Sequence, residues 1–199
     1  SYFAGEKNTD ESIRFNFSSF GYVVSSPKNN KQWKRINMAF GYNRLSNYKN
    51  RTYINGYNSN SSLIDHFVAN ANTQGVINNL NSFAELLAWN TYLFDPIDTI
   101  DNGNYISNLN SGLSKRQEKI IESNGNSGEY VFTIGTSFED KIYLGATIGM
   151  PNIDYREKST YTESEFVDTA THLQSFEYHE EFSTSGNGFN LKVGVIARL

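Results

Sequence analysis

The sequence predicts an all-β fold, an antiparallel transmembrane β-barrel of which about five strands are present in these 199 residues. Several segments alternate large apolar side chains with Gly, Ser, Thr or Asn, as strands do between lipid and a polar interior. Short turns, at 25–32 and 138–141, alternate with long excursions, at 59–124 and about 157–174. Outer-membrane barrels have short turns on one side and long loops on the other. We therefore treat 1–199 as a single partial β-barrel domain with 59–124 as a helical loop insertion.

Composition excludes several other classes. The formal net charge of −4 provides no basic surface for nucleic acid. The absence of Cys removes disulfides, thiolate metal sites and Cys nucleophiles. No run approaches the roughly 18 to 20 apolar residues that a membrane helix needs, so a membrane would be crossed by strands. The segment 1–11 has neither the basic start nor the apolar centre of a signal peptide.

The clearest strand signal is a hairpin at 129–150. Its two strands share one apolar face, formed by Tyr130, Phe132, Ile134, Thr136, Phe138, Ile142, Leu144, Ala146, Ile148 and Met150. Successive strand residues point to opposite faces, so the other face is built mainly of Gly, Thr and Ser. A soluble sandwich normally carries Lys, Glu and Arg on its outer face. The hairpin therefore favours a barrel with apolar residues outside and small or polar residues inside.

Strands on both sides of this hairpin repeat the arrangement. The first, 12–25, slips in phase near Ser18, which indicates a bulge; its apolar residues are Ile13, Phe15, Phe17, Phe20, Tyr22 and Val24. The second, 33–45, begins with Trp33, which suits a membrane interface or the edge of a sandwich. Residues 51–58 extend that strand or return from it. The chain continues through 152–163, returns through 172–186 and ends in 188–199, where Lys192 and Arg198 are expected to face a lumen.

Between Ser59 and Asn124 the period changes to that of helices. A Ser followed three residues later by an acid or amide, the capping-box pattern, predicts three helix starts at Ser62, Ser82 and Ser114. The second helix, 82–94, must end before Pro96 because the residue preceding a proline is disfavoured in the α region. It has apolar residues on most of its surface, so we expect protein or ligand to cover it.

The sequence resembles the FadL/TodX-type outer-membrane transporters of long-chain fatty acids and other hydrophobic compounds, in the branch often labelled haemin receptor. The runs that carry the resemblance are FGYNRLSNYKNRTYINGYN, SLIDHFVANANTQG, GEYVFTIGTSFEDKIYLGATIGMPNIDYREKSTY and STSGNGFNLKVGVIARL. The resemblance implies a fourteen-stranded barrel with a hatch in its lumen and helical extracellular loops that catch hydrophobic molecules. About five strands and no hatch segment are found here, so we expect an internal portion of a longer protein.

The predicted function is uptake of hydrophobic small molecules, such as long-chain fatty acids, by a channel in the bacterial outer membrane. We expect no enzyme, no cofactor and no metal site, because His66, His172 and His179 are scattered and the Asp95–Asn104 acids lack the order of a calcium loop. The expected partners are outer-membrane lipid, a hydrophobic ligand, and the remaining strands or other envelope proteins. The predicted ligand-binding residues are Phe67, Phe83, Leu86, Trp89, Tyr92 and Leu93, whereas Leu87 and Phe94 suit a binding surface and the core of the loop equally.

Two alternatives remain open at this stage. One is a soluble, secreted β-rich binding module, which needs a second sheet to bury its apolar strand faces. The other is a barrel that serves as a structural or assembly component of an envelope complex, in which case the loop residues contact protein instead of ligand.

Overall fold

The computed structural model describes residues 2–3, 6–7, 17–28, 32–98, 102–109, 112–167 and 173–198. The chain folds as two compact units. Unit 1 comprises Ser1–Thr9, Tyr53–Ile120 and Thr160–His179, and unit 2 comprises Asp10–Thr52, Ile121–Ser159 and Glu180–Leu199.

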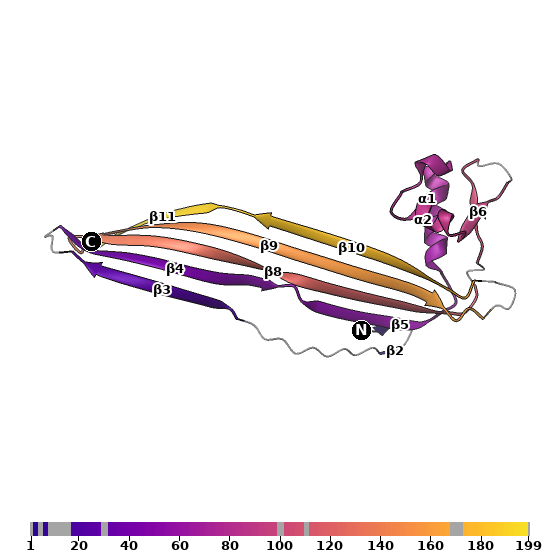
Figure 1. Cartoon of the computed structure of the whole chain (residues 1–199), viewed down its shortest axis with the longest axis horizontal. Helices are drawn as coiled ribbons and strands as arrows, with labels where there is room; N and C mark the ends of the chain where they lie inside the picture. Colours follow the sequence, from indigo (N-terminus) through magenta and orange to yellow (C-terminus); the bar gives the residue numbers. More distant parts are fainter. Residues whose placement is uncertain are drawn as a thin grey trace. The chain divides into compact units, whose positions relative to one another are not determined.

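The fold is mostly antiparallel β-sheet with two short α-helices, which confirms the coarse prediction (Figure 1). The strands of the main sheet are β3 (Ser19–Pro27), β4 (Trp33–Asn47), β5 (Asn50–Asn58), β8 (Lys115–Phe138), β9 (Ile142–Ser164), β10 (Ser175–Asn187) and β11 (Asn190–Ala197). Five of them form the path β10-β9-β8-β4-β3, while β11 also pairs with β9 and β5 with β8. Within the described residues the outer strands of this path do not pair with each other, so the sheet is not closed into a barrel.

Two hairpins of unit 2 are those that the sequence predicts. Strand β3 pairs with β4 without interruption, from Ser19 opposite Asn43 to Pro27 opposite Arg35. Strands β8 and β9 are joined by residues 139–141, of which Glu139 and Asp140 have positive φ, at 52° and 53°. Two successive left-handed residues characterise the type I′ turn, whose twist matches that of the strands beside it. Residues 12–16, which include the predicted Ile13 and Phe15, lie outside the described part of the chain.

Gly125 of β8 has a backbone conformation that favours glycine. Its φ is 124°, and a Cβ there would lie 2.1 Å from the carbonyl oxygen of Asp154 on β9. The backbone of Tyr48, after β4, donates a hydrogen bond of 3.0 Å to the Gly125 oxygen. Only glycine combines this backbone conformation with so close an approach of two strands.

Unit 1 contains the helices. Helix α1 (Leu63–Gln74) begins at the predicted capping box, in which the Ser62 side chain accepts from the Ile64 N–H and the Asp65 side chain accepts from the Ser62 N–H. Helix α2 (Glu85–Asn90) and the small hairpin of β6 (Phe94–Pro96) and β7 (Tyr105–Ser107) follow. Three further short elements are η1 (Ile77–Asn79), β1 (Tyr2–Phe3) and β2 (Glu6–Lys7).

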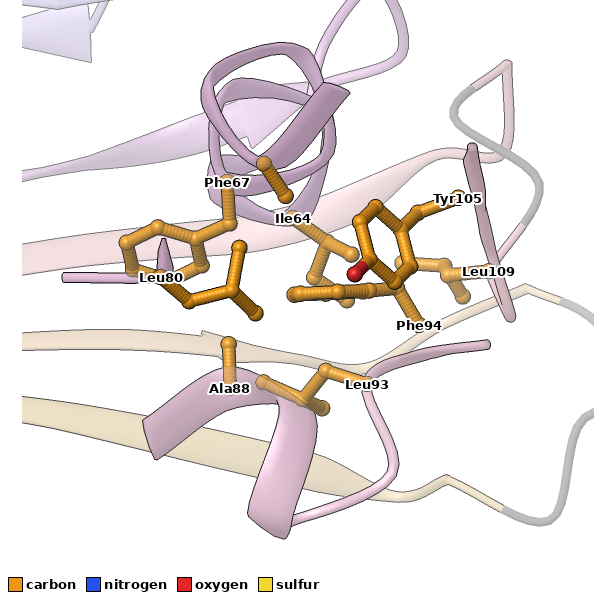
Figure 2. Packing of buried hydrophobic residues seen from close by; sticks show 9 residues of the cluster. Ile64, Phe67, Leu80, Ala88, Leu93, Phe94, Tyr105 and Leu109 are labelled. Carbon is orange, nitrogen blue, oxygen red and sulfur yellow. The ribbon is translucent and has the colours of Figure 1, made fainter. Parts of the chain in front are cut away.

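The hydrophobic core of unit 1 lies between these elements (Figure 2). Its fully buried centre is the ring pair Phe94 and Tyr105, with ring centroids 5.4 Å apart and planes at 72°. The other core residues are Ile64, Phe67, Ala71, Leu80, Ala88, Leu93 and Leu109.

Two helix predictions are corrected. Of the predicted helix 82–94, only Glu85–Asn90 is helical, as α2. The Asn81 side chain accepts a hydrogen bond from the Phe83 N–H and holds residues 82–84 in a turn. After the helix, Tyr92 has a φ of 58°, which does not continue it. The helix predicted from Ser114 is wrong, because β8 begins at Lys115. There the pairing of β8 with β5 and β9 outweighs a local capping signal, so the helical insertion does not extend to 124.

Candidate functional site

The strand register of unit 2 gathers large apolar side chains on one face of the sheet. Tyr22 lies opposite Phe40, Phe40 opposite Phe132, and Leu191 opposite Ile148. We call this surface the apolar face; it comprises Phe20, Tyr22, Val24, Met38, Phe40, Tyr42, Tyr130, Phe132, Ile134, Leu144, Ile148, Met150, Leu191, Val193 and Val195.

Most of the apolar face is exposed in this chain. All its members except Phe40 and Tyr42 are exposed, and Val193 reaches 75%. Covering one such side chain is worth about 1.5–3 kcal/mol, and soluble monomers rarely expose apolar patches above a few hundred Å². This surface therefore has the character of one that lipid or another apolar partner covers.

Aromatic pairs lie near both ends of the apolar face. Trp33 and Phe138 meet edge to face, 5.2 Å apart, beside the short turns. Tyr42 and Tyr130 meet at 4.9 Å toward the other end. Phe138 and Tyr130 are eight positions apart on β8, which at ~3.3 Å per residue is roughly 26 Å, close to the ~25 Å apolar band of a membrane barrel.

Beyond Met150 the same side of β9 becomes charged. Arg156 and Lys158 continue its two-residue period, and both pair with Glu181 of β10, at 4.0 Å and 3.5 Å. The change from apolar to charged residues therefore occurs within a few positions of the Tyr42–Tyr130 pair.

The opposite face of this part of the sheet, which we call the polar face, is built of smaller groups. The hydroxyls of Thr133 and Thr147 are hydrogen-bonded at 2.9 Å, and Asn190 donates to Glu129 at 2.6 Å. Its remaining members include Gly21, Gly41, Gly135, Gly145, Gly149, Lys192 and Gly194, with Val23, Val131, Tyr143 and Ile196 as the larger exceptions. The two faces thus differ as the sequence predicts.

The six predicted ligand-binding residues of unit 1 do not form one surface. Phe67 and Leu93 are core residues, with 4% and 7% exposure. Leu86 and Trp89 are half-buried against that core. Phe83 and Tyr92 are exposed, at 83% and 79%.

The aromatic contacts explain this division. The Trp89 ring lies 5.8 Å from Phe94 and 5.5 Å from Tyr105, and the Phe67 ring packs edge to face on Tyr178 at 5.5 Å. Of the two residues that suited either role, Phe94 is fully buried and Leu87 is exposed. Since α2 has only six residues, one side of it fills the core and the other presents Phe83, which precedes it, and Leu87.

A buried carboxylate that the sequence did not single out lies at the start of α1. Glu163 of β9 is fully buried and accepts four hydrogen bonds, from Ser62 Oγ, the Leu63 N–H, Gln117 Nε2 and Tyr161 Oη, at 2.6–2.9 Å. Burial, with this bond to Glu163, raises the pKa of the Tyr161 hydroxyl far above its usual range. Because this buried carboxylate accepts four hydrogen bonds from protein donors, we assign the cluster to the folding of unit 1.

A second polar network in unit 1 is exposed. Arg116 lies 3.5 Å from Glu118 and 3.4 Å from Glu165. Tyr57 donates to Glu165, and this bond, followed by the ion pair with Arg116, lowers the pKa of the Glu165 carboxyl. The hydrogen bond with Tyr53 is the main reason why the pKa of Arg116 is raised. Solvent screens exposed ion pairs of this kind, so each contributes little to stability.

The described residues hold no group of three or more His, Asp or Glu placed to bind a metal ion. Asp98 is bonded to Asn102 and Asp95 to Asn108, so these two acids are engaged separately, while Asp101 and His172 lie outside the described residues. His66 contacts Asn70 at 3.2 Å. In the part of the chain that the structure describes, no helix is both long and apolar enough to span a membrane.

Comparison of the chain with protein-family models, curated protein sequences and solved structures finds no match.

Proposed function

We propose that this chain is part of a β-barrel in the bacterial outer membrane that takes up hydrophobic small molecules such as long-chain fatty acids. The observation that carries the proposal is the apolar face, which is continuous across β3, β4, β8, β9 and β11 and opposed by a face of mainly small and polar residues. Large outward apolar residues with small or polar inward ones are the pattern of membrane barrels.

The dimensions of the apolar face favour lipid as the covering partner. Its roughly 26 Å between the aromatic pairs suits the ~25 Å apolar band of an outer-membrane barrel. The rings of Trp33 and Tyr42 then lie at headgroup level, and Arg156 and Lys158 lie outside the hydrocarbon. The open outer strands of the sheet are completed by the remaining strands of a longer chain or by partner proteins.

Two features support transport of a hydrophobic ligand. On the polar face a Cβ would make only ordinary backbone contacts at Gly21, Gly135 and Gly145 and would meet nothing at Gly194, which leaves room in a lumen. Unit 1 exposes Phe83, Leu87 and Tyr92, apolar or amphipathic side chains outside its own core that suit first contact with such a ligand. The resemblance to long-chain fatty-acid transporters points to the same class of compound.

Site-directed spin labelling tests the membrane orientation. The chain has no Cys, so each introduced Cys is the only labelled position. Labels at Phe132, Ile134 and Val193 are expected to collide with oxygen dissolved in lipid, and labels at Thr133, Gly135 and Lys192 with a water-soluble nickel complex. Liposomes that contain the purified chain provide the measurement.

An alternating pattern along β8 supports the proposal, and equal access of the nickel complex to both sets overturns it. A chain that stays folded and monodisperse in buffer without detergent favours the soluble binding module instead. Retention of the alternating pattern without any binding of fatty acid favours the structural or assembly barrel.

A further inference from the structure

A groove follows β9 between the large side chains of the apolar face. Two hollows, of about 420 Å³ and 290 Å³, meet where Ile134 and Ala146 line both of them. Ala146 is smaller than its neighbours on this side of the sheet, and the register places it opposite Val193 of β11. We call the furrow that remains above Ala146 the turn-side groove. The other large side chains along it are Trp33, Ile36, Leu144 and Ile148.

The turn-side groove occupies the half of the apolar face that is nearest to the short turns. Along β9 it extends from Leu144 to Ile148, four positions, which at ~3.3 Å per residue is roughly 13 Å. This length is about half of the ~25 Å apolar band of a membrane barrel, the depth of one leaflet. It therefore fits an acyl chain of a lipid in the turn-side leaflet, whereas a membrane-spanning partner helix needs contact along the full band.

Cations gather where the groove meets the short turns. Backbone hydrogen bonds of 2.7–2.9 Å join the strand ends there, namely Lys28 to Lys34, Glu139 to Gln32 and Arg198 to Lys141. The described residues of these ends, 27–28, 32–35, 138–142 and 196–198, include five cations and only two acids, although the chain as a whole has a formal charge of −4. The cations are Lys28, Lys34, Arg35, Lys141 and Arg198, and the acids are Glu139 and Asp140.

Lys28 lies on the groove side of the sheet. It continues the two-residue period of Tyr22 and Val24 past the end of β3, and successive residues of a strand point to opposite faces. In the described part of the chain Lys28 forms no ion pair. A Lys side chain can lay its stem along apolar surface and present its ammonium group at the membrane interface.

Lys34 follows Trp33, the groove residue at the short turns. It lies at a register shift, which leaves Trp33 opposite Phe138 and Arg35 opposite Ser137. On the polar face it also lines a cavity of about 500 Å³ with Arg35 and Asp140. Lys34 thus lies at the boundary between the two faces, and among the described residues it too forms no ion pair.

We propose that the turn-side groove binds one anionic phospholipid, with an acyl chain along Ala146 and the phosphate group at Lys28 and Lys34. Ammonium groups bind phosphate through charge-assisted hydrogen bonds, and the Trp33 ring beside them suits headgroup level. This binding mode rests on the proposed function, in which lipid covers the apolar face. It adds that lipid with a negative head group is held here in preference to zwitterionic lipid.

Quenching of Trp33 fluorescence by brominated lipids tests the head-group preference. The chain has two Trp, so Trp89→Phe leaves Trp33 as the one fluorescent indole. In liposomes, phosphatidylglycerol with brominated acyl chains competes with unlabelled phosphatidylcholine for the site beside Trp33, and the labels are then exchanged. We expect a preference for phosphatidylglycerol of about fivefold or more, the effect of one Lys near an anionic lipid surface.

Two sets of variants locate the site. Lys28→Gln with Lys34→Gln is expected to remove the preference, whereas Lys49→Gln, on an exposed position outside the groove, keeps it. Ala146→Leu fills the groove and is expected to reduce quenching by either brominated lipid. Ala197→Leu makes the same change on the same side of β11, outside the groove, and leaves quenching unchanged.

Equal affinity for the two lipids in the Trp89→Phe chain overturns the inference, as does a preference that the double Lys variant retains. Weak quenching by both lipids also overturns it, because protein then covers the groove. Spin labels in the same liposomes separate this inference from the proposed function. An alternating pattern along β8 together with equal lipid affinity removes the lipid site and leaves the membrane assignment standing.

Discussion

Ser62 and Glu163 are 101 residues apart in sequence and joined by a hydrogen bond of 2.6 Å. Ser62 caps α1, and Glu163 also accepts from the N–H of Leu63, the first residue of that helix. A carboxylate at this place satisfies two donors and stabilises the positive end of the helix dipole. The start of the helical segment is thus fixed by a residue of strand β9, within unit 1.

Glu163→Ala is therefore expected to destabilise unit 1 by about 3 kcal/mol, because buried donors left without a partner cost ~1–3 kcal/mol each. The donors concerned are Ser62 Oγ, the Leu63 N–H, Gln117 Nε2 and Tyr161 Oη. Hydrogen exchange followed by mass spectrometry is the measurement, and amides of α1 are expected to lose protection first. Glu122→Ala removes an acid from an exposed ion pair with Arg51 and is the control, expected to cost below ~1 kcal/mol. Equal protection of α1 in both variants contradicts the prediction.

The contact between α1 and α2 is expected to weaken in acid. Burial by itself raises the pKa of the Glu85 carboxyl, but the hydrogen bonds from Asn70, its own backbone N–H and Gln74, with His66 nearby, hold it below 4.5. A lowered pKa means that the ionised form stabilises the fold above pH 4.5 and that this stabilisation is lost as the pH falls through the folded value.

The measurement is hydrogen exchange of α1 and α2 as a function of pH, corrected for the intrinsic exchange rate. In Glu85→Gln the loss of protection below pH 4.5 is expected to shrink, since residue 85 no longer titrates. A pH dependence identical to that of the native chain assigns the acid effect to another group.

Adding a methyl group is expected to destabilise unit 2 at Gly125 and to change its stability little at Gly194. Gly125→Ala places Cβ 2.1 Å from the Asp154 carbonyl oxygen at a φ of 124°, so we expect a cost above ~1 kcal/mol. Gly194→Ala meets nothing within 4 Å and has no positive φ, so its effect is expected within ~0.5 kcal/mol. Urea titration of the chain in detergent micelles compares the two, and equal midpoints contradict the steric argument.

The strands of unit 2 were predictable because a period of two extends over many residues. The alternation of Phe132, Ile134 and their neighbours predicts the apolar face of β8 from that one strand. The register of β8 with β4 then places the apolar faces of the two strands side by side. The capping box at Ser62 was predictable for a similar reason, since both its partners lie within one helical turn.

The predictions that were wrong concern signals that tertiary pairing decides. Ser114 and Gln117 have the spacing of a capping box, but Gln117 belongs to β8 and donates to Glu163. The burial of the predicted ligand-binding residue Phe67 could not be read from the local pattern either, because Phe67 packs on Tyr178, which comes from a distant segment. The cavity lined by Lys34, Arg35 and Asp140 forms only when two strands and a turn are in register, so no single segment of the sequence predicts it.

The exposed aromatic residues of unit 1 provide the last prediction. Phe83→Ala with Tyr92→Ala is expected to leave the stability of unit 1 within ~0.5 kcal/mol, because both side chains lie outside the core. Phe94→Ala is the matched core variant and is expected to cost ~3–5 kcal/mol, since Phe94 is fully buried against Tyr105 and Trp89. If Phe83 and Tyr92 make first contact with a hydrophobic ligand, their double variant slows the association rate of a fluorescent fatty acid in stopped-flow mixing. An unchanged rate with intact folding removes these two residues from the ligand path and leaves them as candidates for a protein interface.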